Sequence, residues 1–119
     1  MRIGPIFLLL LLAACGGGSA PESGSAPAVE GARLFKAKGC YSCHSIGDGP
    51  KAGPDLKGLF ARREEAWIRA YVSDPVAMVA SDPIARGLKE QYKIQMPKMM
   101  ISPQEMDALL GYLRGATQP

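Results

Sequence analysis

The sequence has little of what several common classes of protein require. It contains a single histidine, so a site that needs two imidazoles from this chain is excluded. Its three cysteines are too few for a disulfide-dense secreted scaffold. The net charge is only +3 and the basic residues are dispersed, whereas a nucleic-acid binder normally carries a basic stripe. No phosphate-binding loop, catalytic triad or paired-carboxylate site is found, so we expect no nucleic-acid partner, no small-molecule substrate and no catalytic residue.

Aromatic residues are also scarce, at 7% of 119 residues, while 14 glycines and 10 prolines indicate many loops. A chain of this length forms one small domain. Because so few large apolar side chains give a small core, we expect the domain to need a covalent cross-link or a bound metal to stabilise its fold.

The N-terminus is typical of an export signal. Residues 3–14 are almost entirely apolar, but as a helix they would span roughly 18 Å, short of the ~30 Å hydrocarbon core. Residues 12–15 read Leu-Ala-Ala-Cys, which resembles the bacterial lipobox, although an ordinary signal peptide with an incidental cysteine is the alternative. We expect residues 1–14 to be a lipoprotein signal peptide and Cys15 to carry lipid. The protein would then lie in the bacterial cell envelope, lipid-anchored on the extracytoplasmic (periplasmic) side of a membrane.

Residues 16–27 are rich in Gly, Ser, Ala and Pro and have almost nothing apolar to bury. Such a segment cannot offset the entropy lost on ordering. The composition therefore predicts a flexible tether over residues 15–27, with a reach of about 20 Å. It changes at Ala28, where we place the start of a domain over residues 28–119.

The chemistry is carried by Cys40-Tyr41-Ser42-Cys43-His44, a Cys-x-x-Cys-His motif that is typical of c-type haem attachment. Two thiols three positions apart on a helical turn face the same way and can add to the two vinyl groups at one porphyrin edge. The next residue, His44, can then offer a ring nitrogen to the iron.

The motif has three other possible interpretations. A thioredoxin-like disulfide between Cys40 and Cys43 expects a βαβ context, and no strand-rich run is present. A zinc site needs four ligands, and a second Cys/His pair is absent. A chance match is the third. The export signal favours haem, because c-type haem is attached outside the cytoplasm.

With these features the chain resembles a class I monohaem c-type cytochrome, in a bacterial lipoprotein form, over roughly residues 28–116. Gly31 and Phe35 match the family's first helix, where the glycine lets the terminal helices cross closely, and Leu109 and Tyr112 match the partner pair. The resemblance implies an all-α fold of four to five short helices around one haem c, covalently bound through Cys40 and Cys43.

Two further stretches resemble the family. Residues 53–56 match its Gly-Pro-x-Leu sequence, which implies that the Pro54 carbonyl accepts the proton on the far nitrogen of the axial His44. Residues 58–62 resemble its Gly-Leu-Phe-Gly-Arg stretch, which implies that Arg62 hydrogen-bonds a haem propionate. Ala61 replaces a glycine there, and Arg63 is a neighbour that could substitute.

The sixth iron ligand must be something other than histidine, and a methionine thioether is the remaining soft ligand. Once Met1 has left with the signal, five candidates remain: Met78, Met96, Met99, Met100 and Met106. Met106 has the spacing of core residues on the last helix, and Met78 lies in an apolar run as filler.

Met96 precedes Pro97, which holds its backbone out of a helix. The family also has its ligand methionine just before a proline, so we predict Met96 as the ligand. Met99, Met100 and an open site are alternatives. We expect Met99 and Met100 to pack beneath the last helix or line the haem rim.

The remaining pattern predicts helices at residues 29–38, 55–60, 64–73, 82–92 and 102–114. Asp82-Pro83 and Ser102-Pro103 supply N-caps followed by proline, and Gly115 would end the last helix. Trp67 is either core or a propionate donor.

The predicted function is single-electron transfer between redox partner proteins. Residues 66–103 resemble small membrane-tethered cytochromes that accompany bacterial respiratory reductases and oxidases. The alternatives are a haem subunit of an oxidoreductase complex, or a haem peroxidase or sensor with an open sixth site. Five lysines flank the site and could steer an acidic partner or simply be solvated: Lys36, Lys38, Lys51, Lys57 and Lys98.

Overall fold

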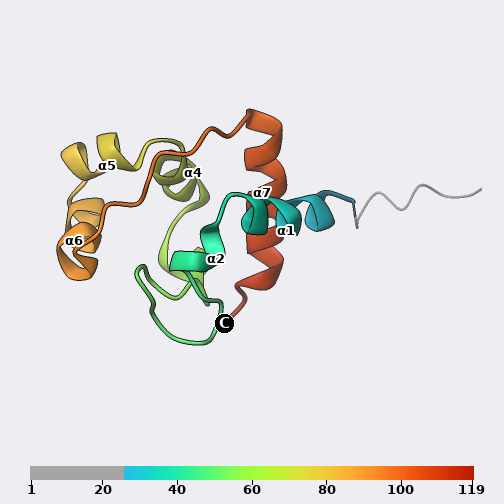
Figure 1. Cartoon of the computed structure of the whole chain (residues 1–119), viewed down its shortest axis with the longest axis horizontal. Helices are drawn as coiled ribbons and strands as arrows, with labels where there is room; N and C mark the ends of the chain where they lie inside the picture. Colours follow the sequence, from blue (N-terminus) through green and yellow to red (C-terminus); the bar gives the residue numbers. More distant parts are fainter. Residues whose placement is uncertain (1–25) are drawn as a thin grey trace, which may run out of the picture.

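The structure is a computed structural model that describes residues 26–119. These residues form helices joined by loops, with no strand among them, so the predicted all-α fold is confirmed (Figure 1). The helices are α1 (Ala26–Ala37), α2 (Cys40–Cys43), α3 (Leu59–Arg62), α4 (Glu65–Ser73), α5 (Pro75–Ser81), α6 (Pro83–Tyr92) and α7 (Pro103–Ala116). This is more helices than the four or five expected, because α2 is a single turn and α5 was not predicted.

The first and last helices cross in close contact, as the resemblance implied (Figure 1). Gly31 of α1 lies at the crossing, where an added Cβ would overlap the Ala108 carbonyl oxygen and the Tyr112 Cβ of α7. Phe35, one turn further along α1, packs on Tyr112 with ring centroids 5.8 Å apart. Glycine is therefore required at position 31 by the distance between the two backbones.

The core lies between this crossing and α4. Its buried side chains form one cluster: Phe35, Leu56, Ile68, Val72, Met106, Leu109, Leu110 and Leu113. Met106 is only 3% exposed, so its predicted packing role is confirmed. Several cavity-facing residues, Met96 and Met99 among them, pack against the edge of this cluster, which therefore supports the site described below.

Three helices begin with a capping side chain followed by proline. Asp82 accepts a hydrogen bond from the Ala85 amide at 2.8 Å and starts α6, and Ser102 and Glu105 form the predicted capping box of α7. Asp74 accepts from the Ala77 amide at 3.0 Å and starts α5 in the same way. Asp74-Pro75 is therefore the sequence signal for α5, although the apolar residues that follow it show no helical spacing that would predict a helix.

Most predicted helix boundaries differ from the structure by one to four residues, and three of the differences have a visible cause or consequence. Helix α1 begins at Ala26, so its first turn includes the last two residues of the predicted tether and crosses the composition change at Ala28. Helix α3 begins four residues later than predicted, because the backbone amide of Lys57 binds the Asp55 side chain. Helix α7 passes through Gly115 and ends at Ala116, where the buried Thr117 hydroxyl donates to the Leu113 carbonyl at 2.7 Å.

The predicted signal peptide, Cys15 and most of the tether lie outside the described residues. Within residues 26–119, no helix combines the length and the apolar character that a membrane span requires.

Candidate haem site

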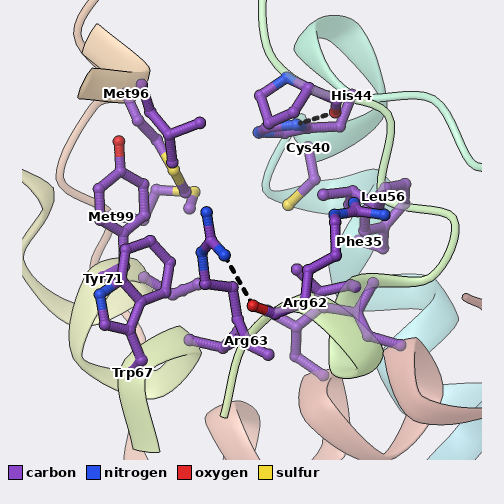
Figure 2. A pocket seen from close by; sticks show the side chains of 17 residues that line it. Phe35, Cys40, His44, Leu56, Arg62, Arg63, Trp67, Tyr71, Met96 and Met99 are labelled. Atoms are coloured by element: carbon purple, nitrogen blue, oxygen red, sulfur yellow. Dashed lines mark hydrogen bonds between the residues drawn. The ribbon is translucent and has the colours of Figure 1, made fainter. Parts of the chain in front are cut away.

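An apolar cavity separates the loop after α2 from α4, α6 and the segment that follows α6 (Figure 2). Its walls are formed by Phe35, Cys40, His44, Pro54, Leu56, Leu59, Arg62, Arg63, Trp67, Ile68, Tyr71, Val72, Leu88, Met96, Met99, Leu109 and Leu113. An adjoining cavity shares His44, Pro54 and Met96 with it and adds Cys43. All six residues predicted to hold the cofactor therefore meet at one place in the fold.

The two cysteines lie on the single helical turn α2. Gly39 adopts a left-handed backbone conformation, with φ of +73°, and so redirects the chain from α1 into α2. Both thiols are free and half-buried, and burial raises the pKa of the Cys40 thiol. The disulfide interpretation is therefore not supported. Zinc is not supported either, because no three Cys, His, Asp or Glu side chains in the described part of the chain come together as metal ligands.

His44 is oriented by the backbone of the loop that follows it. Its Nδ1 lies 2.9 Å from the Pro54 carbonyl oxygen, the contact that the resemblance implied. A carbonyl can only accept, so Nδ1 carries the proton and Nε2 keeps its lone pair for a metal. The Gly53 amide also donates to the Cys43 carbonyl at 2.8 Å, which fixes the loop beside the motif.

Asp55 organises this loop, and the sequence reasoning missed its role. Its carboxylate accepts hydrogen bonds from the backbone amides of Gly47, Gly49 and Lys57, at 2.7–2.8 Å. These bonds, that of Gly47 first, lower the pKa of the Asp55 carboxyl to about 2. Asp55 thus holds the turn whose preceding carbonyl, at Pro54, meets His44. Asp followed by loop glycines was the signal available in the sequence.

The three methionines of this segment differ in whether their side chains face the cavity or the solvent. Met96 and Met99 both line the cavity, and Figure 2 shows them on the wall that faces Cys40 and His44. The Met100 side chain is 88% exposed, so the expectation that it packs under the last helix or at the rim is wrong. Met99 lines the cavity, and the side chain of the next residue, Met100, points into solvent instead.

The two arginines have different surroundings. Arg62 lines the cavity, but its guanidinium donates to the backbone carbonyls of Lys57 and Asp55, the latter at 2.9 Å. The Arg63 guanidinium projects into the cavity in Figure 2, donates to the Arg62 carbonyl at 2.6 Å and lies 5.4 Å from the centre of the Trp67 ring. Neither arginine forms an ion pair within residues 26–119. An apolar cavity lined by two such cations fits an apolar ligand that carries acidic groups.

Trp67 is stacked on Tyr71, with ring centroids 5.0 Å apart. Its buried indole N–H has no hydrogen-bond partner, although it is close enough to Asp82 to contribute to the lowered pKa of that carboxyl, which is due first to the Ala85 amide. A buried donor without a partner costs free energy and is consistent with a ligand group that would satisfy it. The fit of this cavity to haem thus rests on thiols, imidazole, thioethers and unused donors together.

Three of the five flanking lysines are occupied by contacts within the chain. Lys38 contacts Met100 and Glu105, Lys51 donates to the Tyr41 carbonyl at 2.8 Å, and Lys98 pairs with Asp74 at 2.6 Å. The five lysines are therefore not one steering group, because these three have separate contacts within the chain.

Comparison with known proteins agrees with this geometry. The chain is similar to cytochrome c from Rhodothermus marinus, with a TM-score of 0.74, 28% identity, and 96% of this chain and 90% of that chain covered. It is also similar to the cytochrome c domain of the pp3183 protein from Pseudomonas putida, with a TM-score of 0.64 and 34% identity. That match covers 73% of this chain and 87% of the Pseudomonas chain.

Among curated proteins, cytochromes c of Cochliobolus lunatus and Arabidopsis thaliana are each 50% identical over 38 residues. This match covers 30% of the chain, and only about a third of the length of either relative. The family model for cytochrome c, in contrast, matches residues 28–117. Since that match takes in the cysteine pair, His44 and the methionine segment, the chain belongs to the cytochrome c family.

Proposed function

We propose that this protein is a single-electron carrier that holds one haem c covalently and ligates its iron with His44 and Met96. One arrangement carries the proposal: an imidazole fixed at Nδ1 by Pro54 faces a thioether across a single apolar cavity (Figure 2). Membership in the cytochrome c family supports a haem-based electron carrier.

The thiols of Cys40 and Cys43 would attach the cofactor. Each thiol would add across one vinyl group, forming a sulfur–carbon bond, and the thiol hydrogen would pass to the other vinyl carbon. The step balances without an oxidant, which suits thiols that are free rather than paired. Two such bonds on the single turn of α2 would prevent dissociation.

The axial residues would set the electronic properties. The bound haem would supply the one-electron couple of its iron. The hydrogen bond from Nδ1 to the Pro54 carbonyl keeps Nε2 unprotonated and raises its basicity. A methionine ligand raises the reduction potential relative to nitrogen ligation, and the apolar walls limit access of water.

Arg63 is the residue we assign to a haem propionate, in preference to Arg62. Arg62 is already held by two backbone carbonyls, whereas the Arg63 guanidinium projects into the cavity, donates to one carbonyl and forms no ion pair within residues 26–119. The Trp67 indole N–H, buried and without a partner, is a second donor available to the same group.

We further propose that Cys15 carries lipid and that the residues before α1 tether the domain to the outer face of a bacterial membrane. The motive is the lipobox-like junction and the Gly/Ser/Pro-rich segment that follows it. Electrons would pass between partner proteins of a respiratory chain or of an extracytoplasmic reductase or oxidase.

Optical spectroscopy of the protein matured with its cofactor tests the proposal. We expect one haem c with two thioether bonds in the alkaline pyridine spectrum. The oxidised protein should show the weak far-red band of methionine ligation, and a redox titration should fit one electron. A five-coordinate oxidised iron that reacts rapidly with hydrogen peroxide would contradict the proposal and favour an open-site enzyme or sensor. His44→Ala is the control, because it should lose the low-spin spectrum.

A further inference from the structure

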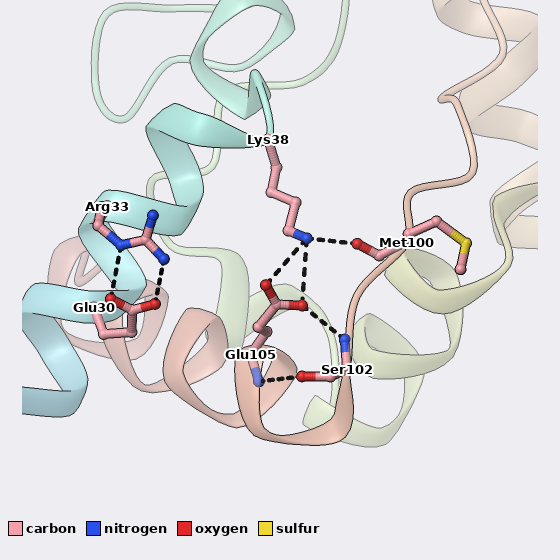
Figure 3. A network of polar contacts seen from close by, with 6 residues as sticks. All are labelled: Glu30, Arg33, Lys38, Met100, Ser102 and Glu105. Atoms are coloured by element: carbon pink, nitrogen blue, oxygen red, sulfur yellow. Dashed lines mark hydrogen bonds and ion pairs between the residues drawn. The ribbon is translucent and has the colours of Figure 1, made fainter.

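The side chain of Lys38 joins two segments that are far apart in the sequence. Its ammonium donates to the backbone carbonyl of Met100 at 2.5 Å and lies 3.3 Å from the carboxylate of Glu105 (Figure 3). The Lys38 side chain is 21% exposed and that of Glu105 is 35% exposed, so the contact between Lys38 and Glu105 is partly shielded from water.

Glu105 is itself held rigidly. Its carboxylate accepts the Ser102 amide at 2.8 Å, and its own amide donates to the Ser102 hydroxyl at 3.2 Å (Figure 3). The Ser102 amide, and after it Lys38, lower the pKa of the Glu105 carboxyl. The acceptor that Lys38 meets is therefore a preformed part of the α7 N-terminus and not a mobile surface carboxylate.

The contact spans the two walls of the cavity. Lys38 directly follows α1 and lies two residues before Cys40, while Met100 follows Met96 and Met99 in the irregular segment between α6 and α7. The Met100 side chain is exposed, so its carbonyl is the part of this residue that the fold uses. The Lys38 side chain therefore links the segment that contains Cys40 to the segment that contains Met96 and Met99.

The same segment has a second anchor at Lys98, which lies between Met96 and Met99. Lys98 pairs with Asp74 at the start of α5, at 2.6 Å, but at an exposed site. The Lys98 and Asp74 side chains are 58% and 39% exposed, whereas those of Lys38 and Glu105 are 21% and 35% exposed. Exposed ion pairs contribute little to stability. Lys38, which its pair with Glu105 fixes in place, is thus the better-held donor to this segment, although its bond to the Met100 carbonyl is itself exposed.

We propose that Lys38 is a positioning residue for the axial methionine. By holding the Met100 carbonyl and Glu105, it keeps residues 95–102 closed over the cavity, and so raises the fraction of molecules in which the Met96 sulfur occupies the sixth position. This inference rests on the proposed function, because it needs haem in the cavity and Met96 as its ligand.

Binding of free imidazole to the oxidised protein tests this inference, because imidazole must displace the methionine. Lys38→Met removes the charge and the donors but keeps the apolar stem, so its imidazole affinity should rise on the order of tenfold, or about 1.4 kcal/mol. Lys38→Arg, which can still donate to both acceptors, should stay near the wild-type value. Lys36→Met is the matched control, because it removes an equal charge from an exposed position on α1.

The reduction potential should fall in Lys38→Met and be restored in Lys38→Arg, a pattern that loss of stability alone would not produce. Circular dichroism melting shows that each variant is folded, and Glu105→Gln replaces Lys38→Met if the latter does not fold. Equal imidazole affinity in Lys38→Met and wild type, or an equal increase in Lys36→Met, would overturn the inference. A wild-type protein without the far-red band would instead overturn the proposed function, so the two failures are distinguishable.

Discussion

The Nδ1 atom of His44 lies 2.9 Å from the carbonyl oxygen of Pro54, and no side chain other than the imidazole takes part in this contact. The ring is therefore aimed by backbone, and the conformation of residues 53–58 decides where its second nitrogen points. The chain controls that conformation with Gly53, Asp55 and Arg62, each through a contact of its own.

Gly53→Ala should displace the His44 ring. An added Cβ would lie 2.6 Å from His44 Cε1 and 3.0 Å from Nδ1, which forces the ring or the loop to shift. Overpacking of this kind typically costs about 1–3 kcal/mol. We expect lower stability in urea unfolding and a changed low-spin spectrum. Gly87→Ala is the control, because a Cβ there meets no atom within 4 Å and α6 should tolerate it.

Asp55 should make the free energy of unfolding depend on pH in the acidic range. Its pKa is lowered from the usual 3.8 to about 2 by backbone hydrogen bonds, that of Gly47 first. A depressed folded-state pKa gives stability that is fully present above about pH 4 and is lost as the pH falls towards 2. The urea midpoints of wild type and Asp55→Asn should therefore converge over this window. A constant gap between them from pH 6 to pH 2 would refute the role of the carboxylate. Asp48→Asn, in the same loop, is the control.

Arg63→Gln should lower the reduction potential. Removing a cation from the cavity favours the oxidised iron, which carries one more positive charge than the reduced iron. Arg62→Gln should act mainly on stability, because its donors hold the Lys57 and Asp55 carbonyls. Potentiometry and urea unfolding of both variants separate the roles. The reverse pattern, with Arg62 controlling the potential, would restore the assignment implied by the family motif.

Cys15→Ala should release the protein from membranes. If Cys15 carries lipid, fractionation of cells should find wild type in the membrane fraction and the variant as a soluble, still red protein. Mass spectrometry of the wild type should show an acylated N-terminal cysteine. A fully soluble wild type would contradict the anchor.

The sequence predicted the parts of the fold that local patterns determine. Asp82-Pro83 and Ser102-Pro103 located the starts of α6 and α7, because a cap followed by proline specifies a helix start within a few residues. The same pattern at Asp74-Pro75 was overlooked in favour of its apolar neighbours. Gly115 did not end α7, because the Thr117 hydroxyl bound to Leu113 closes the helix instead.

The site shows the same division between local and distant contacts. The spacing of Cys40, Cys43 and His44 lies within five residues, so it could be read directly. The contact from Lys38 to Met100 crosses 62 residues, and the outward turn of Met100 depends on packing that no short window contains. Likewise, Arg62 and Arg63 are neighbours in sequence and both line the cavity, and only the fold shows that the Arg62 guanidinium binds the loop backbone while that of Arg63 projects into the cavity.

The far-red band of the oxidised protein in three matched methionine variants is the most direct test of His44 and Met96 as the axial pair. Met96→Ala should lose the band, lower the reduction potential and bind carbon monoxide when reduced. Met99→Ala should keep the band and lose stability by less than the about 2–5 kcal/mol of a fully buried truncation, since Met99 is only partly buried. Met100→Ala should match wild type, because its side chain is exposed. Loss of the band in Met99→Ala, with the band retained in Met96→Ala, would contradict the account.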